Sequence, residues 1–209
     1  MKNRLEIVLL IMLLMLIAGC GGGNLGFPDE PEEPLKAKQL VDSGWLQYEL
    51  GNYNAAITLF NDAKKADASY LDSYNGLGWS YFRVHNLILS LFNFRIPLDT
   101  DSTLTDVQAG YAIAAFEKNE YNETISAIVS VVTHDSVRFD LEGTDEYFFS
   151  HDTNVTSRKI RKIFALAYYY SGLFDESYFQ LVTFLDPLTN IDPLADDFLE
   201  ELLRRLEEA

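Results

Sequence analysis

The sequence predicts an all-α fold, a solenoid of about four helix–turn–helix units followed by a C-terminal capping helix. Turn residues recur at a fixed interval, and small and large apolar side chains recur at matched places around them. Apolar residues make up 48% of the 209 residues and aromatic residues 13%, a composition that excludes a disordered body. The periodic region, residues 35–209, is long enough for one domain with a substantial core.

Residues 1–19 have the composition of a secretory signal peptide. Lys2 and Arg4 precede an apolar run over residues 7–18, which is shorter than the roughly 20 residues that cross a membrane as a helix. The run ends in Leu-Ile-Ala-Gly-Cys and resembles the lipobox of bacterial lipoproteins. The resemblance implies cleavage before Cys20 and lipidation, typically with palmitate, of Cys20. An ordinary signal peptide and a single membrane-anchoring helix remain as alternatives.

The expected location is a cell membrane, to which the lipid on Cys20 anchors the chain. Gly21 rather than an aspartate follows this cysteine, which favours the outer membrane, facing the periplasm. Cys20 is the chain's one cysteine, so a disulfide or a cysteine-based metal site is excluded. Residues 20–34 combine glycines, prolines and carboxylates and predict a flexible acidic linker. A net charge of −16 argues against nucleic acid as a partner, because phosphate backbones are repelled.

The repeat is anchored on its turns. Gly51, His85 and Asn119 are evenly spaced, and Gly172 follows after the same interval lengthened by an insertion at residues 139–157. Glycine and asparagine suit a reversal through a positive backbone angle. An apolar residue follows each turn residue by two positions; these are Tyr53, Leu87, Tyr121 and Phe174.

Side-chain size follows the same register. Small residues precede each turn by seven positions and follow it by five; they are Gly44, Gly78, Ala112, Ala165, Ala56, Ser90, Thr124 and Ser177. Large apolar residues follow each turn by nine; they are Phe60, Phe94, Ile128 and Leu181. Small residues where two helices cross allow close approach, and large residues fill the space beside the crossing. The pattern therefore predicts antiparallel helix pairs.

This pattern resembles the tetratricopeptide repeat (TPR), a helix–turn–helix unit of about 34 residues. The units are expected at residues 37–70, 71–104, 105–138 and 158–190, with the insertion at 139–157 and an amphipathic capping helix at 193–208. Two capping boxes, at residues 69–72 and 103–106, are predicted to begin the first helices of the second and third units. Pro97 is expected to stop the second helix of unit two early.

The insertion carries the aromatic residues Tyr147, Phe148 and Phe149. One interpretation is a binding flap or β-hairpin, with strands at 138–141 and 146–149 around a turn at 142–145. The other is that these aromatics pack on the fourth unit. Residues 152–156 are expected to begin the following helix, with Asp152, Thr153 or Thr156 as its cap.

The first helices of TPR units line an inner face, and in this register aromatic residues recur there. We expect the ladder to bind a protein or peptide partner, because aromatic residues dominate interface hot spots; its members are Trp45, Tyr48, Trp79, Phe82, Phe116 and Tyr169. The alternative is that these side chains fill the core between units.

No constellation in the sequence predicts catalysis. Ser150, His151 and Asp152 are adjacent, and adjacent side chains cannot form the relay of a catalytic triad. We therefore expect no catalytic residue, no bound metal and no cofactor. The predicted function is a protein-interaction scaffold of the bacterial cell envelope, anchored by lipid. The alternative is a surface lipoprotein that binds glycans or nutrients for an outer-membrane transporter, which aromatics exposed around Tyr147 to Phe149 would favour.

Overall fold

The computed structural model describes residues 33–134, 147–187 and 189–209, and residues 33–209 form one compact unit. The predicted signal peptide, Cys20, nearly all of the linker and most of the insertion lie outside the described residues. Among the described residues, no helix is both long and apolar enough to cross a membrane.

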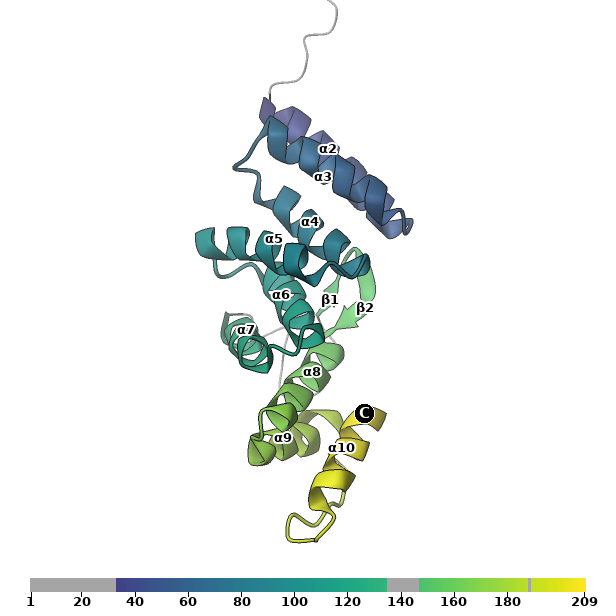
Figure 1. Ribbon diagram of the computed structural model, residues 1–209, viewed down its shortest axis with the longest axis vertical. Helices are drawn as coiled ribbons and strands as arrows, with labels where there is room; N and C mark the ends of the chain where they lie inside the picture. The colour runs from purple at the N-terminus through teal and green to yellow at the C-terminus, as the bar shows by residue number, and fades with distance from the viewer. Residues whose placement is uncertain (1–32, 135–146, 188) are drawn as a thin grey trace, which may run out of the picture. The chain divides into compact units, whose positions relative to one another are not determined.

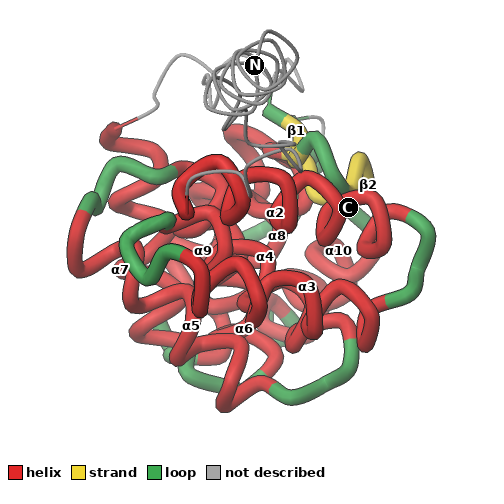
Figure 2. The backbone as a smooth tube through the Cα atoms, turned by 90° about the horizontal axis from the view of Figure 1, so that it is seen from above, coloured by secondary structure: helices red, strands yellow, loops and turns green. Residues whose placement is uncertain are grey.

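The unit consists of helix pairs that follow one another along the stack (Figure 1). The pairs are α2 (Glu33–Glu49) with α3 (Tyr53–Ala66), α4 (Leu71–Arg83) with α5 (Leu87–Thr100), α6 (Thr105–Glu117) with α7 (Tyr121–His134), and α8 (Ser157–Tyr170) with α9 (Phe174–Gln180). A π-helical turn, Leu181–Leu185, continues α9, and α10 (Phe198–Glu208) ends the described chain. Figure 2 shows a mostly helical backbone with short strands at one side. The predicted fold class is confirmed: a TPR-like α-solenoid with a terminal helix and a β-hairpin.

The four turns within the pairs share one backbone conformation. Their φ angles are 78° at Gly51, 58° at His85, 64° at Asn119 and 77° at Gly172. At each turn the next N–H donates to the carbonyl five residues back at 2.9 Å, as in Asn52 to Gln47 and the equivalent bonds of the other three turns. This is the Schellman arrangement, which satisfies carbonyls at a helix end. The predicted reversal through a positive angle is confirmed at all four positions.

Glycine is required where the first two pairs pack. The Phe60 ring lies between α2 and α4, and a Cβ added at Gly44 or Gly76 would come within 2.6 Å or 2.3 Å of it. One repeat later Phe94 lies in the same way against Gly78 and Gly110. In the third and fourth units the large residue is aliphatic and the small one is alanine. The aliphatic side chain of these two units is smaller than phenylalanine, so there is room at the helix crossing for the Cβ of alanine.

A buried hydroxyl joins the two helices of three pairs. Ser90 Oγ donates to the Gly78 carbonyl at 2.8 Å, and Ser177 Oγ donates to the Ala165 carbonyl at 2.9 Å. Thr124 holds the equivalent place in the third pair, with its Oγ1 3.4 Å from the Ala112 carbonyl. The sequence pattern predicts small residues here; the hydroxyl adds a hydrogen bond between the helices.

Two details of the expected helix ends are wrong. Helix α5 continues through Pro97 to Thr100, because proline already has a helical φ and only one further turn follows it. The capping boxes do not form: Asp67 and Asp101 accept the hydroxyl and N–H of Ser69 and Thr103, so α4 and α6 begin without a side-chain cap.

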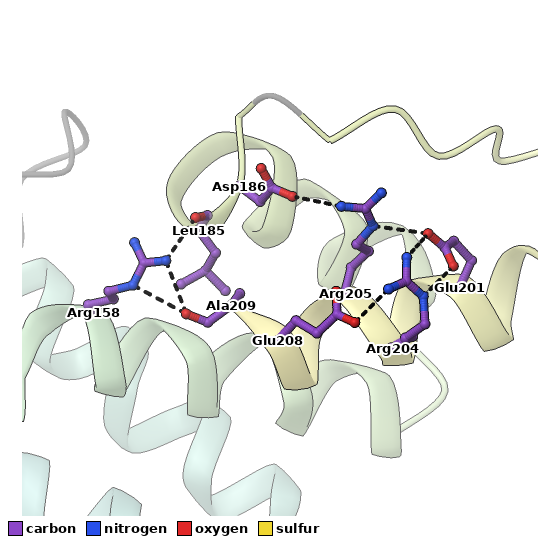
Figure 3. A network of polar contacts seen from close by, with 8 residues as sticks. All are labelled: Arg158, Leu185, Asp186, Glu201, Arg204, Arg205, Glu208 and Ala209. Atoms are coloured by element: carbon purple, nitrogen blue, oxygen red, sulfur yellow. Dashed lines mark hydrogen bonds and ion pairs between the residues drawn. The ribbon is translucent and has the colours of Figure 1, made fainter.

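The capping helix α10 covers the last pair. Leu202 and Leu206 are buried, and α10 packs against α8 and the π-helical turn. Figure 3 shows Arg158 of α8 donating to the carbonyls of Leu185 and Ala209, at 3.2 Å and 3.0 Å. The expected start at residue 193 is too early, because the helix begins only at Phe198. Leu194 precedes it and is 92% exposed rather than on the buried face.

Candidate functional site

The hairpin of the insertion is formed by β1 (Phe148–Phe149) and β2 (Asp152–Thr156), which pair antiparallel around Ser150 and His151. The expected strand at 146–149 therefore overlaps β1, but its partner is the segment that we expected to begin a helix. The expected first strand, 138–141, lies outside the described residues. Thr156 ends β2 and caps α8 by accepting from the Lys159 N–H, as predicted for one of three candidates.

Alternation along β1 gives the hairpin one buried face. Tyr147 and Phe149 have no exposed surface, whereas Phe148 between them is 56% exposed. Successive side chains of a strand point to opposite faces, so Tyr147 and Phe149 share the face that packs against the helices. Val155 of β2 is also buried. The hairpin is thus held by its side chains as well as by its short ladder.

The buried face lies on aromatic residues of the first two units. The Phe149 ring stacks on Trp79 with ring centroids 4.5 Å apart, and it meets Trp45 edge-on at 5.7 Å. His151, at the hairpin turn, stacks on the other indole, that of Trp45, at 4.0 Å. These contacts come from α2 and α4, whereas one of our two interpretations placed the aromatic residues of the insertion on the fourth unit.

Polar contacts fix the hairpin at both ends. The Tyr147 hydroxyl donates to Asp106 Oδ1 of α6 at 2.8 Å. His151 Nδ1 and Glu49 Oε1 lie 2.7 Å apart, and Asp152 lies 3.6 Å from the Arg83 guanidinium. We call the residues that receive the hairpin the hairpin-binding face; they are Trp45, Tyr48, Glu49, Trp79, Arg83 and Asp106.

Two donors of this face are buried without an acceptor. The Tyr48 hydroxyl and Trp79 Nε1 have no hydrogen-bond partner among the described residues. Burial, together with the nearby Asp152 carboxylate, raises the pKa of Tyr48 well above its ordinary value, so this hydroxyl keeps its proton. Leaving a buried donor unpaired costs about 1–3 kcal/mol. Trp45 Nε1, in contrast, donates to Asp72 Oδ2 at 3.0 Å.

The structure separates the predicted ladder into three groups. Trp45, Tyr48 and Trp79 lie buried beneath the hairpin, and Phe82 is half-buried beside Trp79.

Phe116 is half-buried and contacts Tyr121 and Tyr170. Tyr169 donates from its hydroxyl to the Leu199 carbonyl of α10 at 3.1 Å. The ladder therefore does not form one open surface: a hairpin covers its first part, and the capping helix meets its last.

Several members of the site were not expected from the sequence. Asp72 and Asp106 stand one repeat apart and were assigned to helix caps, although both carboxylates accept from aromatic side chains instead. Their shared place in the repeat, on the same helix as the aromatic residues, was the available signal. His151 and Asp152 carried no such signal, because the insertion occurs once.

A separate pocket of about 360 Å³ lies between α5, α6 and α7. Its lining combines Leu98 and Ala127 with the polar side chains of Gln108, Tyr111 and Glu123, among others. None of the residues predicted as a site lies in it. Within the described residues, no group of three or more histidine or acidic side chains is placed to hold a metal ion.

Comparison with solved structures places the fold beside MamA, a protein of TPR-like fold. A structure of a MamA mutant is 18% identical and covers 84% of this chain and 92% of that chain, with a TM-score of 0.59. Another MamA crystal structure is 14% identical and covers 84% and 81%, with a TM-score of 0.56. No protein-family model matches the chain, and no curated protein matches it in sequence. At this identity the likeness shows the shared fold.

Proposed function

We propose that this protein is a non-catalytic interaction scaffold of the bacterial cell envelope, anchored by lipid on Cys20 and placed at the outer membrane, facing the periplasm. One observation carries the scaffold: the helix pairs present an aromatic face that holds an extended segment through side-chain contacts. Such a face suits a protein partner, because a strand offers alternate side chains to fixed pockets.

The histidine and the carboxylate at the hairpin turn are held in structural contacts, which supports binding rather than catalysis. His151 meets Glu49, and Asp152 meets Arg83, while Ser150 is an exposed residue of the hairpin turn. A nucleophile needs a base within hydrogen-bond reach, and the neighbouring histidine is stacked on Trp45 instead.

The glycan-binding alternative has little support from the hairpin. It requires several aromatic rings exposed on one surface, and Tyr147 and Phe149 are buried. Of Tyr147, Phe148 and Phe149, only Phe148 is exposed. We therefore favour a protein partner.

The anchor is tested with a labelled fatty acid. Cells that produce the chain are grown with labelled palmitate, and the membrane and soluble fractions are compared for the native sequence and Cys20→Ser. We expect the label and the membrane association to be present in the native protein and absent in the variant. Equal membrane association of both would exclude a lipid on Cys20 as the anchor.

The partner is tested with a photo-crosslinking phenylalanine analogue at Phe148 in the intact envelope. Phe179, on α9, is a matched control, because it has the same residue type and the same 56% exposure. A scaffold that binds through the hairpin region gives a discrete crosslinked protein from position 148 and none from position 179. Absence of a protein adduct at position 148, or the same adducts at both positions, would contradict this function.

A further inference from the structure

Two tryptophans one repeat apart differ in their hydrogen bonds. Trp45 and Trp79 hold the same place in the first and second units, and Asp72 and Asp106 hold the same place in the second and third. Trp45 Nε1 donates to Asp72, whereas Trp79 Nε1 is buried without an acceptor in the part of the chain that the structure describes. The repeat therefore predicts a bond between Trp79 and Asp106 that is not made.

The hairpin accounts for the difference. Asp106 Oδ1 accepts from the Tyr147 hydroxyl at 2.8 Å, so a residue of the insertion binds this carboxylate. At the equivalent place one repeat earlier, Asp72 accepts from Trp45 and from Asn75, both of which belong to the helical stack. The third unit therefore differs from the second in that its carboxylate bonds to the hairpin.

The hairpin also has the features of a bound ligand. A ladder of two and five residues is marginal by itself, so its conformation depends on the face beneath it. Phe149 lies against both tryptophans, and three residues later Asp152 faces Arg83. The buried donors of Tyr48 and Trp79 are satisfied by any ligand that adds an acceptor there.

We propose that the hairpin is an intramolecular ligand of the hairpin-binding face, and that it competes there with an extended partner segment of the same chemistry. That segment carries an aromatic residue for the place of Phe149 and, three positions later, a carboxylate for Arg83. On binding, it displaces Tyr147 from Asp106, and the Trp79 indole then donates to the Asp106 carboxylate. This inference rests on the proposed scaffold function and adds the partner's chemistry and its regulation by the hairpin.

A peptide with the sequence of residues 147–156, carrying a fluorescent label, is the probe. Its binding is measured by fluorescence anisotropy to the full chain, to Phe149→Ala, which empties the place between the tryptophans, and to Phe148→Ala, a control on the exposed side of the same strand. A closed face lowers apparent affinity by the fraction of molecules that are open. We expect at least tenfold tighter binding to Phe149→Ala than to the other two proteins.

Specificity is checked with a second peptide that carries the equivalents of Phe149→Ala and Asp152→Asn. It should lose at least tenfold in affinity for the Phe149→Ala protein. Equal binding of the first peptide to all three proteins, no binding to any, or equal binding of both peptides would overturn the proposal.

The bond exchange has its own readout, which also serves if Phe149→Ala does not fold. Tyr147→Phe removes only the hydroxyl that binds Asp106. We expect the indole N–H proton of Trp79 to shift downfield in the NMR spectrum of Tyr147→Phe, and that shift to be lost in Tyr147→Phe with Asp106→Ala, which removes the acceptor. An unchanged Trp79 signal in Tyr147→Phe would refute the exchange. Neither assay uses a cellular partner, so failure of the scaffold function is seen separately, in the crosslinking experiment.

Discussion

At the scale of single residues, the four turns show where the repeat tolerates an unfavourable conformation. His85 and Asn119 adopt positive φ angles of 58° and 64° in the places that glycine holds in the first and fourth units. Asparagine and histidine are found in this region more often than most residues, but in both the Cβ lies close to the backbone there. The surrounding fold therefore holds the His85 turn in this unfavourable conformation, since the Schellman hydrogen bonds form at His85 as they do at Gly51.

Replacement of His85 by glycine should relieve this strain. We expect His85→Gly to raise the free energy of unfolding by about 1 kcal/mol, because glycine has no Cβ to clash at positive φ. Urea denaturation of the protein measures the change. The matched control, Gly51→Ala, should lower stability by a similar amount; a destabilised His85→Gly protein would contradict the strain.

Single residues also show which part of the site the sequence could predict. The aromatic character of Trp45 and Trp79 and their shared place in the repeat followed from the period. Their burial did not, because it depends on Phe149 and His151, which no repeat position constrains. The role of Asp106 was missed for a related reason: a capping-box pattern explains the same residue, and only the fold shows that Asp101 has taken the hydroxyl of Thr103.

At the scale of elements, the packing of helix pairs depends on matched volumes. The Phe94 ring lies where a Cβ on Gly78 would come within 2.5 Å, whereas the fourth unit combines Ala165 with Leu181. Close packing makes such pairs interdependent. The small-and-large pattern predicted from the sequence is thus a property of each pair of positions.

A double-mutant cycle tests that dependence. Gly78→Ala should destabilise the protein by about 1–3 kcal/mol through overpacking against Phe94. Combined with Phe94→Leu, it should cost about 1 kcal/mol less than the sum of the two single changes. Gly78→Ala with Phe60→Leu is the control, because Phe60 contacts Gly44 and Gly76 instead, and should be additive. An additive result for both pairs would show that volume matching is not the constraint.

The capping helix is the element whose stability should depend on pH. Hydrogen bonds from Arg204, and to a smaller extent from Arg205, lower the pKa of Glu201 from its ordinary value of 4.5 to about 2 (Figure 3). A carboxylate with a lowered pKa in the folded state stabilises the fold above its ordinary pKa. The contribution is lost as pH falls through the lowered value.

We therefore expect the native protein to be slightly more stable to heat than Glu201→Gln at neutral pH. The difference should shrink as pH falls from 4.5 towards 2. Thermal unfolding of both proteins across this range, with Glu200→Gln as a neighbouring control, measures it. A difference that stays constant with pH would exclude the ion pairs as its cause. The effect is small, because solvent screens these exposed groups.

At the scale of the whole molecule, the part of the fold that could be predicted is the part made by neighbours in sequence. Each unit packs on the next through contacts that recur once per repeat, so the period alone gives the order of the stack. The hairpin depends on contacts of another kind: His151 meets Glu49 across 102 residues, and Tyr147 meets Asp106 across 41. No local pattern encodes such pairings. The predicted strand at 146–149 overlaps β1, but its partner is β2 rather than the predicted strand at 138–141.

The hairpin changes what the stack presents to a partner. An inner face of aromatic residues is expected to be open in a simple repeat, and here α2 and α4 have theirs covered by a segment inserted before the fourth unit. In the proposed function, the hairpin is therefore a segment of the protein that occupies its own binding face. Recognition of a partner would then depend on how readily that segment leaves.

Nuclear Overhauser contacts of the Phe149 ring, observed in the protein with selectively labelled aromatic residues, show whether the hairpin occupies the aromatic face. If it does, strong cross-peaks join Phe149 to the indole protons of both Trp45 and Trp79, and none of these arises from the exposed Phe148 ring. Cross-peaks from Phe149 to residues of the hairpin alone, with both indoles accessible to solvent, would contradict a covered face.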